Sequence, residues 1–86
     1  MYKISLHKKA VKYYKSLDNN TAKRINKAID EMGKNPLEGA NIKRLKGRYR
    51  GKYRYKVGGL RIVYRVNEGN KSIFVEAIGP RGDVYR

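Results

Sequence analysis

The sequence predicts an α+β fold in which an N-terminal strand and a two-helix hairpin pack on an antiparallel meander of three strands. One indication is the apolar spacing, which changes from every second residue to helical spacing and then returns to every second residue. Another is a pair of hairpin-turn signals, Gly58-Gly59 and Glu68-Gly69-Asn70, between the last strands. With 86 residues and 40% apolar content, the chain has enough material for one small core, so we expect a single domain over residues 1–86.

The N-terminal part has the pattern of a strand followed by a helix. Residues 2–6 alternate between apolar and polar side chains, which is typical of a short half-buried strand. From about His7 to Leu17 the apolar residues follow helical spacing instead, so that one stripe of a helix is apolar. That stripe consists of Ala10, Tyr13, Tyr14 and Leu17.

A second helix is predicted from about Thr21 to Gly33. The polar residues 18–21 end the first helix and offer several N-cap candidates for the second. Gly33 followed by Asn35-Pro36 is a strong stop signal. The apolar stripe of this helix consists of Ala22, Ile25, Ala28, Ile29 and Met32. Two short helices in succession form a hairpin.

The rest of the chain has the pattern of strands. Residues 37–47 form an irregular polar connection, which we interpret as a loop or a short turn of helix. Strands are predicted over Tyr49–Val57, Leu60–Val66 and Ser72–Ile78. The last of these is apolar on both faces, so we expect it to be a central strand.

The first strand of the meander separates cations from aromatic residues. One face holds Tyr53, Tyr55 and Val57, and the other holds Lys52, Arg54 and Lys56. We expect the two helices to cover the apolar face of the sheet. The cations then lie on the opposite face, where Lys52, Arg54, Arg61 and Arg81 can share one concave surface.

The charge of the chain points to a polyanionic partner. Lys and Arg number 22 against 7 Asp and Glu, giving a formal net charge of +15. In residues 43–56, eight of fourteen positions are basic and none is acidic. Cations at alternate strand positions share a face at roughly 7 Å spacing and repel one another unless an anion relieves them. Arginine also matches phosphate oxygens through paired hydrogen bonds.

Other kinds of site have little support in the sequence. The chain has no cysteine, which excludes disulfides, thiolate nucleophiles and Cys-type zinc sites. His7 is the only histidine, and no carboxylate cluster suited to magnesium can be assembled. We therefore expect no metal and no small-molecule cofactor. Glu76, in the apolar last strand, is either an ion-pair partner of the cations or a surface residue.

Nothing in the sequence predicts a membrane partner. No apolar run approaches the roughly 18 residues of a membrane span. The first six residues lack the apolar stretch of a signal peptide. We therefore expect a cytoplasmic protein.

A basic site of this kind is suited to cleaving RNA. The ribose 2′-hydroxyl is a built-in nucleophile, so the protein needs to align the attack, move protons and stabilise the phosphorane. Arginine is suited to charge stabilisation, and neighbouring cations lower the pKa of a lysine toward the range of a base. DNA lacks the 2′-hydroxyl, so such a site would be selective for RNA. We expect further RNA contacts from Lys43, Arg44, Lys46, Arg48, Arg50, Lys56, Arg65 and Arg86.

Several segments resemble the RelE/ParE superfamily of toxins from toxin–antitoxin modules. They are Leu45-Lys46-Gly47, Lys52-Tyr53-Arg54, Leu60-Arg61-Ile62-Val63-Tyr64 and the C-terminal Gly79-Pro80-Arg81-Gly82-Asp83-Val84-Tyr85. The resemblance covers nearly the whole chain and includes the order of strands and helices. It implies an mRNA endonuclease that enters the ribosomal decoding site and is inhibited by a cognate antitoxin, which we expect to be acidic.

The resemblance also implies roles for individual residues. Lys52 and Arg54 match a basic pair that binds substrate and accepts a proton, and Arg61 matches an arginine that stabilises the transition state. Arg81 matches a residue implicated as general acid, and Tyr85 matches a tyrosine that stacks on and orients the mRNA. The family often has lysine where this chain has Arg54, so the proton-accepting role is open between Lys52 and Tyr85.

Two other functions stay open from the sequence. One is a ParE-type toxin that inhibits DNA gyrase without cutting RNA, on the same fold. The other is a non-catalytic RNA-binding or ribosome-binding protein, whose charge serves only electrostatic affinity.

Overall fold

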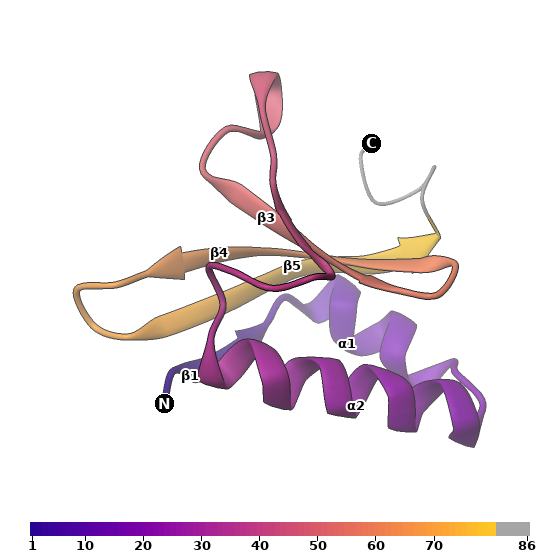
Figure 1. The fold of residues 1–86 in the computed structure, drawn as a ribbon. Coiled ribbons are helices and arrows are strands. Elements are labelled where there is room, and N and C mark those ends of the chain that lie inside the picture. The colour runs from indigo at the N-terminus through magenta and orange to yellow at the C-terminus, as the bar shows by residue number, and fades with distance from the viewer. Residues whose placement is uncertain (81–86) are drawn as a thin grey trace.

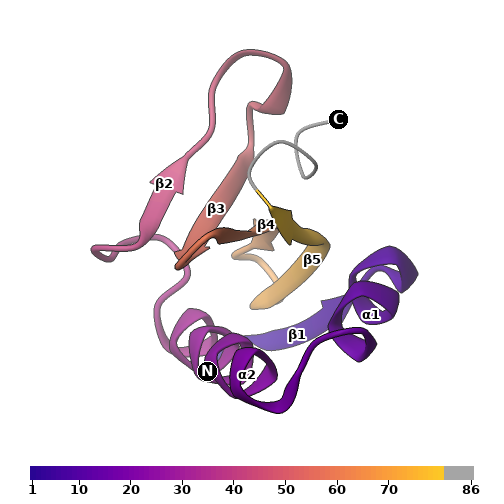
Figure 2. The same cartoon turned by 90° about the vertical axis from the view of Figure 1, so that its right-hand side faces the viewer.

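The computed structural model describes residues 1–80 and confirms the predicted α+β architecture. The elements in chain order are β1 (Lys3–Leu6), α1 (Lys8–Lys15), α2 (Asn19–Lys34), β2 (Ile42–Arg44), the 3-10 turn η1 (Gly47–Tyr49), β3 (Lys52–Val57), β4 (Leu60–Asn67) and β5 (Ser72–Pro80). The strands form one sheet in the order β1-β5-β4-β3-β2, in which only β1 and β5 are parallel. Both helices lie on the same side of this sheet (Figures 1 and 2).

Side-chain caps decide where the helices begin. The Nδ1 atom of His7 accepts a hydrogen bond of 3.0 Å from the backbone N–H of Lys9, at the start of α1. A carboxylate oxygen of Asp18 accepts one from the N–H of Thr21, and this contact lowers the pKa of Asp18. Because Asp18 is the cap, α2 begins at Asn19, two residues before the predicted start.

The segment 37–47, predicted to be a loop or a turn of helix, contains a fifth strand. β2 pairs antiparallel with β3, so that Ile42 lies opposite Tyr55 and Arg44 lies opposite Tyr53. Its three residues are too short a run for the alternation of apolar and polar side chains to be recognised. The prediction of an irregular connection was therefore wrong for these residues, and the pairing gives β3 a neighbour on each side.

The core lies between the helices and the sheet. It contains Ala10, Ile25, Ala28, Met32, Tyr55, Val57, Ile62, Tyr64, Ile73, Val75 and Ile78. β5 lies between β1 and β4, which confirms the expected interior position of the last strand. None of the helices in residues 1–80 is long and apolar enough to cross a membrane.

Tyr64 is the polar anchor of this core. Its ring is fully buried and stacks on the ring of Tyr53, with 5.7 Å between the centroids. Its hydroxyl donates a hydrogen bond of 2.7 Å to the carbonyl oxygen of Pro36, in the connection that follows α2. Burial raises the pKa of Tyr64, which keeps the hydroxyl protonated as this bond requires. The bond thus ties the sheet to the segment leaving the second helix.

We predict that Tyr64→Phe lowers the free energy of unfolding by about 1 to 2 kcal/mol, because it leaves the buried carbonyl of Pro36 without its donor. Tyr14→Phe is the matched control, since it removes an exposed hydroxyl that donates to Asn26. We expect the control to cost less than about 0.5 kcal/mol. Urea unfolding of both variants measures the difference. Equal losses would contradict the anchoring role of Tyr64.

Candidate nucleic-acid interface

The sheet surface opposite the helices, which we call the open face, carries a cluster of cations. Tyr55 and Val57 point into the core, so the alternate residues of β3 point the other way. The register places Arg65 and Arg61 of β4 opposite Lys52 and Lys56. It also places Lys43 of β2 opposite Arg54. The basic cluster of the open face therefore consists of Lys43, Lys52, Arg54, Lys56, Arg61 and Arg65.

Glu76 supplies a negative charge within this cluster. Its carboxylate oxygens lie 2.8 Å from Nζ of Lys52 and 2.6 Å from Nε of Arg65. The ladder between β4 and β5 shifts register between Val63 and Tyr64, which leaves Glu76 as an extra residue on β5. Such a bulge re-aims side chains, and here it directs a carboxylate toward the cations. Of the two readings left open for Glu76, the structure confirms the ion-pair partner.

Two opposing effects determine the pKa of Glu76. Partial burial acts to raise the pKa, while hydrogen bonds and charges from Lys52 and Arg65 act to lower it. The cations outweigh burial, so the pKa of this carboxyl lies below its ordinary value of 4.5. Glu76 is therefore ionised at neutral pH and holds Lys52 and Arg65 in place.

The guanidinium groups of Arg54 and Arg61 are positioned by neutral acceptors. Nη1 of Arg54 donates to the carbonyl oxygen of Asn41 at 3.1 Å. Nη1 of Arg61 donates to the carbonyl oxygens of Leu60 at 3.1 Å and Gly58 at 3.3 Å. Within residues 1–80 no carboxylate is in ion-pair distance of either arginine. Their positive charge is oriented by the backbone but is not neutralised, which suits binding of an anion.

The other basic residues of the predicted site lie elsewhere. Arg44 shares the face of Tyr53, whose hydroxyl accepts a hydrogen bond of 3.3 Å from it, and so lies on the side opposite the cluster. Lys46, Arg48 and Arg50 are exposed in the connection from β2 to β3, around η1. This connection projects away from the helices (Figure 1). The basic cluster in the structure is therefore smaller than the basic site predicted from the sequence.

Three residues of the predicted site, Arg81, Tyr85 and Arg86, lie outside the described residues. The shared surface expected for Lys52, Arg54, Arg61 and Arg81 is therefore observed for the first three, which the register places on the same face. Within the described part of the chain, no group of three His, Asp or Glu side chains is arranged to hold a metal ion.

Phe74 belongs to the open face but was missed in the sequence. It lies opposite Arg65 of β4, and its ring meets the ring of His7 edge-on with 6.1 Å between the centroids. The signal that could have revealed it is the alternation of side chains along β5. Because Ile73 and Val75 point into the core, Phe74 between them must point to the opposite face. The bulge at Glu76 interrupts that phase, so the strand looks apolar on both faces.

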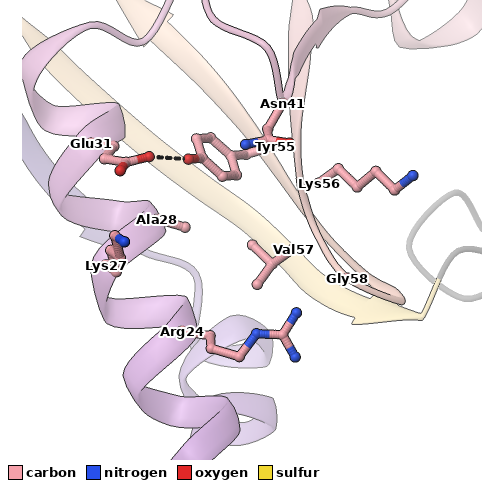
Figure 3. A pocket seen from close by; sticks show the side chains of 9 residues that line it. All are labelled: Arg24, Lys27, Ala28, Glu31, Asn41, Tyr55, Lys56, Val57 and Gly58. Carbon is pink, nitrogen blue, oxygen red and sulfur yellow. Dashed lines mark hydrogen bonds between the residues drawn. The ribbon is translucent and has the colours of Figure 1, made fainter.

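A basic hollow lies between α2 and β3 (Figure 3). It has a volume of about 360 Å³ and is bordered by Arg24 and Lys27. The hydroxyl of Tyr55 donates a hydrogen bond to Glu31 across it, and burial together with this bond raises the pKa of Tyr55. Figure 3 shows the side chain of Lys56 directed away from α2, toward the open face. The hollow thus adjoins the basic cluster at Lys56, which belongs to both.

We predict a pH-dependent role for Glu76. Because its pKa is lowered in the folded state, the stabilisation it provides is complete above the unfolded value and is lost as the pH falls through the folded value. Glu76→Gln should therefore lower the free energy of unfolding at neutral pH, and its difference from wild type should shrink below about pH 4.5. Urea unfolding from about pH 3 to 7 measures this, with Glu68→Gln as an exposed control. A difference that stays constant down to about pH 3 would contradict the ion-pair role.

Comparison with solved structures gives close matches in fold. The chain is 29% identical to RelE in an archaeal RelE–RelB complex from Pyrococcus horikoshii, with a TM-score of 0.81 over 95% of this chain and 97% of that one. It is 27% identical to the isolated RelE toxin of E. coli, with a TM-score of 0.79 over 99% and 92%. YoeB from a heterotetrameric YoeB–YefM complex of Staphylococcus aureus is 25% identical, with a TM-score of 0.74 over 90% and 93%.

Comparison with sequence families agrees with these matches. No curated protein matches the chain. The family model described as the ParE toxin of type II toxin–antitoxin systems, parDE, matches residues 4–85. The resemblance to the RelE/ParE toxin superfamily is thus confirmed. Since that model spans all the described strands and helices apart from the first residue of β1, this chain belongs to the family of ParE toxins of type II toxin–antitoxin systems.

Proposed function

We propose that this chain is the toxin of a type II toxin–antitoxin module and acts as an mRNA endonuclease on the ribosome. The observation that carries the proposal is the pair of arginines on the open face, Arg54 and Arg61. Their guanidinium groups are oriented by backbone carbonyls, and among residues 1–80 no carboxylate lies within ion-pair distance of them. Negative charge builds up on the phosphate in the transition state of cleavage. Cations that are already oriented stabilise this charge without further reorganisation of the protein. Solved relatives that are 25 to 29% identical to this chain include RelE and YoeB toxins.

The chemistry proposed is attack by the ribose 2′-hydroxyl on the adjacent phosphate. The 2′ oxygen forms a bond to phosphorus, the bond from phosphorus to the 5′ oxygen breaks, and a proton passes from the nucleophile to the leaving group. The products are a 2′,3′-cyclic phosphate and a 5′-hydroxyl end. Arg61 and Arg54 are assigned to the charge of the phosphorane.

The ion pair with Glu76 bears on the role of Lys52. The carboxylate of Glu76 lies 2.8 Å from Nζ of Lys52, and this ion pair supports Lys52 as a charge that binds phosphate. Proton acceptance is then assigned to Tyr85, the other candidate from the sequence. Arg81 keeps the role of general acid that the resemblance implies.

The proposal includes a cognate antitoxin and the ribosome with its mRNA as partners. Solved relatives are complexes of RelE with RelB and of YoeB with YefM, which supports an antitoxin for this chain. With a net charge of +15, an acidic antitoxin has complementary charge and associates faster through it. An antitoxin that covers the open face would block the proposed site directly.

A second candidate function is inhibition of DNA gyrase without RNA cleavage. It is favoured by the family model, which is that of ParE toxins. The two functions make different demands on the basic cluster, because only cleavage requires a catalytic arginine at position 61. Supercoiling by gyrase with the wild-type protein is therefore the direct assay for the alternative.

The proposed mechanism predicts the chemical ends of the cut RNA. We expect fragments with 2′,3′-cyclic or 3′-phosphate ends and 5′-hydroxyl ends, because the 2′-hydroxyl is the nucleophile. Mass spectrometry of mRNA from translating ribosomes incubated with purified protein measures them. Substrate with a 2′-deoxy residue at the cut site is the control and should stay intact. Ends with 5′-phosphate and 3′-hydroxyl would refute 2′-hydroxyl attack.

The role of Arg61 predicts a selective loss of rate. We expect Arg61→Ala to lower the single-turnover cleavage rate more than tenfold, about 1.4 kcal/mol or more, while ribosome affinity changes far less. Lys23→Ala is the control, since Lys23 is exposed on α2, on the helix side of the sheet. It should weaken association modestly and leave the rate unchanged.

The same pair of variants separates the two candidate functions. If Arg61→Ala stayed fully toxic on expression, with no RNA cut and with gyrase inhibited, the nuclease proposal would be refuted in favour of gyrase inhibition.

A further inference from the structure

Phe74 is an exposed aromatic ring on the open face, beside the basic cluster and its ion-pair partner Glu76. Its exposed fraction is 38%, and apart from Met1 it is the one large apolar side chain of residues 1–80 that is exposed. Its chain neighbours Ile73 and Val75 are completely buried on the other side of the sheet. Leaving a phenylalanine ring in water forgoes the free energy that its burial would provide. The position therefore suggests a ligand that covers the ring.

The register places Phe74 in a row with two cations of the basic cluster. Ser5, Phe74, Arg65 and Lys52 are successive Cα partners across β1, β5, β4 and β3. Adjacent strands lie about 4.8 Å apart, so the ring lies one strand from Arg65 and two strands from Lys52. A nucleotide has a flat base and a charged phosphate at a similar separation, and this row offers a partner for each.

Arg65 has the freedom to bind a phosphate beside the ring. Its side chain is 60% exposed, and Glu76 contacts it at Nε. Within residues 1–80 no hydrogen bond engages its two terminal nitrogens. The ion pair thus holds the Arg65 side chain at Nε and leaves its two terminal nitrogens available to bind a phosphate.

The surface beside Phe74 is hollowed. A cavity of about 510 Å³ lies at this end of the sheet, bordered by Phe74, Arg65 and Ser72. Its border also includes Asn67, whose side-chain oxygen accepts a hydrogen bond from the backbone N–H of Asn70. On the β1 side the ring is supported by the edge-on contact with His7. The exposed part of Phe74 thus borders open space.

We propose that Phe74 is a stacking platform for an unpaired nucleobase of the RNA, with Arg65 binding the adjacent phosphate. This rests on the proposed function and adds a subsite beyond the residues assigned to cleavage. Aromatic rings on a sheet stack on bases with little sequence preference, and neighbouring cations hold the backbone. RNA is favoured over an apolar protein partner because Phe74 and Met1 are the only exposed large apolar side chains among residues 1–80, and Phe74 lies in a row with the cations Arg65 and Lys52.

The test is binding of a short single-stranded RNA that carries 2′-O-methyl groups and one 2-aminopurine, whose fluorescence is quenched on stacking. The 2′-O-methyl groups remove the nucleophile, so binding is measured without cleavage. Wild-type protein should quench the probe when 2-aminopurine occupies one particular position. Phe74→Leu, which keeps an apolar side chain and removes the ring, should abolish that quenching and weaken affinity about fivefold or more. Phe74→Tyr should bind within about twofold of wild type, because it keeps the ring.

Arg65→Gln is the matched control for charge. It should make the dependence of log affinity on log salt less steep by about 0.7, whereas Phe74→Leu should leave that slope unchanged. Unchanged quenching and affinity in Phe74→Leu would overturn the proposal. So would a Phe74→Leu variant that binds RNA normally and loses affinity only for the antitoxin, since the ring would then belong to a protein interface.

The subsite and the nuclease activity can fail separately. If wild-type protein cuts mRNA and Phe74→Leu changes neither quenching nor KM, only the stacking subsite is refuted. If the probe stacks on Phe74 and no mRNA is cut by wild type, the subsite is supported and the proposed activity is refuted.

Discussion

Successive side chains of a strand point to opposite faces of the sheet. Because of this constraint, the same central strands form the apolar core on one face and the basic cluster on the other. In β3, Tyr55 and Val57 enter the core while Lys52, Arg54 and Lys56 face outward. The antiparallel register with β4 then adds Arg61 and Arg65 to the outward side. A shift of one residue would bury the cations and expose the aromatic rings, so the apolar core holds the basic cluster in its register. The hydrogen bond from Tyr64 to Pro36 and the stacking of Tyr64 on Tyr53 strengthen that core from within.

Charge within the cluster is only partly balanced, and its distribution follows from the bulge on β5. Glu76 neutralises the part of the cluster nearest Lys52 and Arg65, where it also fixes their side chains. Among residues 1–80, Arg54 and Arg61 have hydrogen-bond partners only in backbone carbonyls, so the repulsion between them and the neighbouring cations is not offset there. An anion that binds there relieves this repulsion. The electrostatic free energy of the cluster is therefore lowered more by a negatively charged ligand than by a neutral one.

Much of the architecture could be predicted from the sequence, because it depends on local periodicity and turn chemistry. The helices follow from the spacing of residues such as Ile25, Ala28 and Met32, and the hairpin at Gly58-Gly59 from its turn residues, with Gly58 at a φ of 57°. β2 was missed because three residues carry no period and gain their structure from pairing with β3. For the site, alternation identified Lys52, Arg54 and Arg61, but Phe74 and the ion pairs of Glu76 depend on a bulge between strands far apart in the chain. Such a bulge has no local sequence signal.

The position of β5 has a consequence for the synthesis of the protein. β1 pairs only with β5 among the described strands, and β4 borders β5 on its other side. The first strand of the chain therefore waits for residues 72–80 before it has any partner in the sheet. Contacts of such long sequence separation form late, because loop closure costs entropy before the contacts repay it. A nascent chain that stops before β5 would lack both the partner of β1 and the carboxylate of Glu76, so β1 could not join the sheet and Lys52 and Arg65 would lose their ion-pair partner.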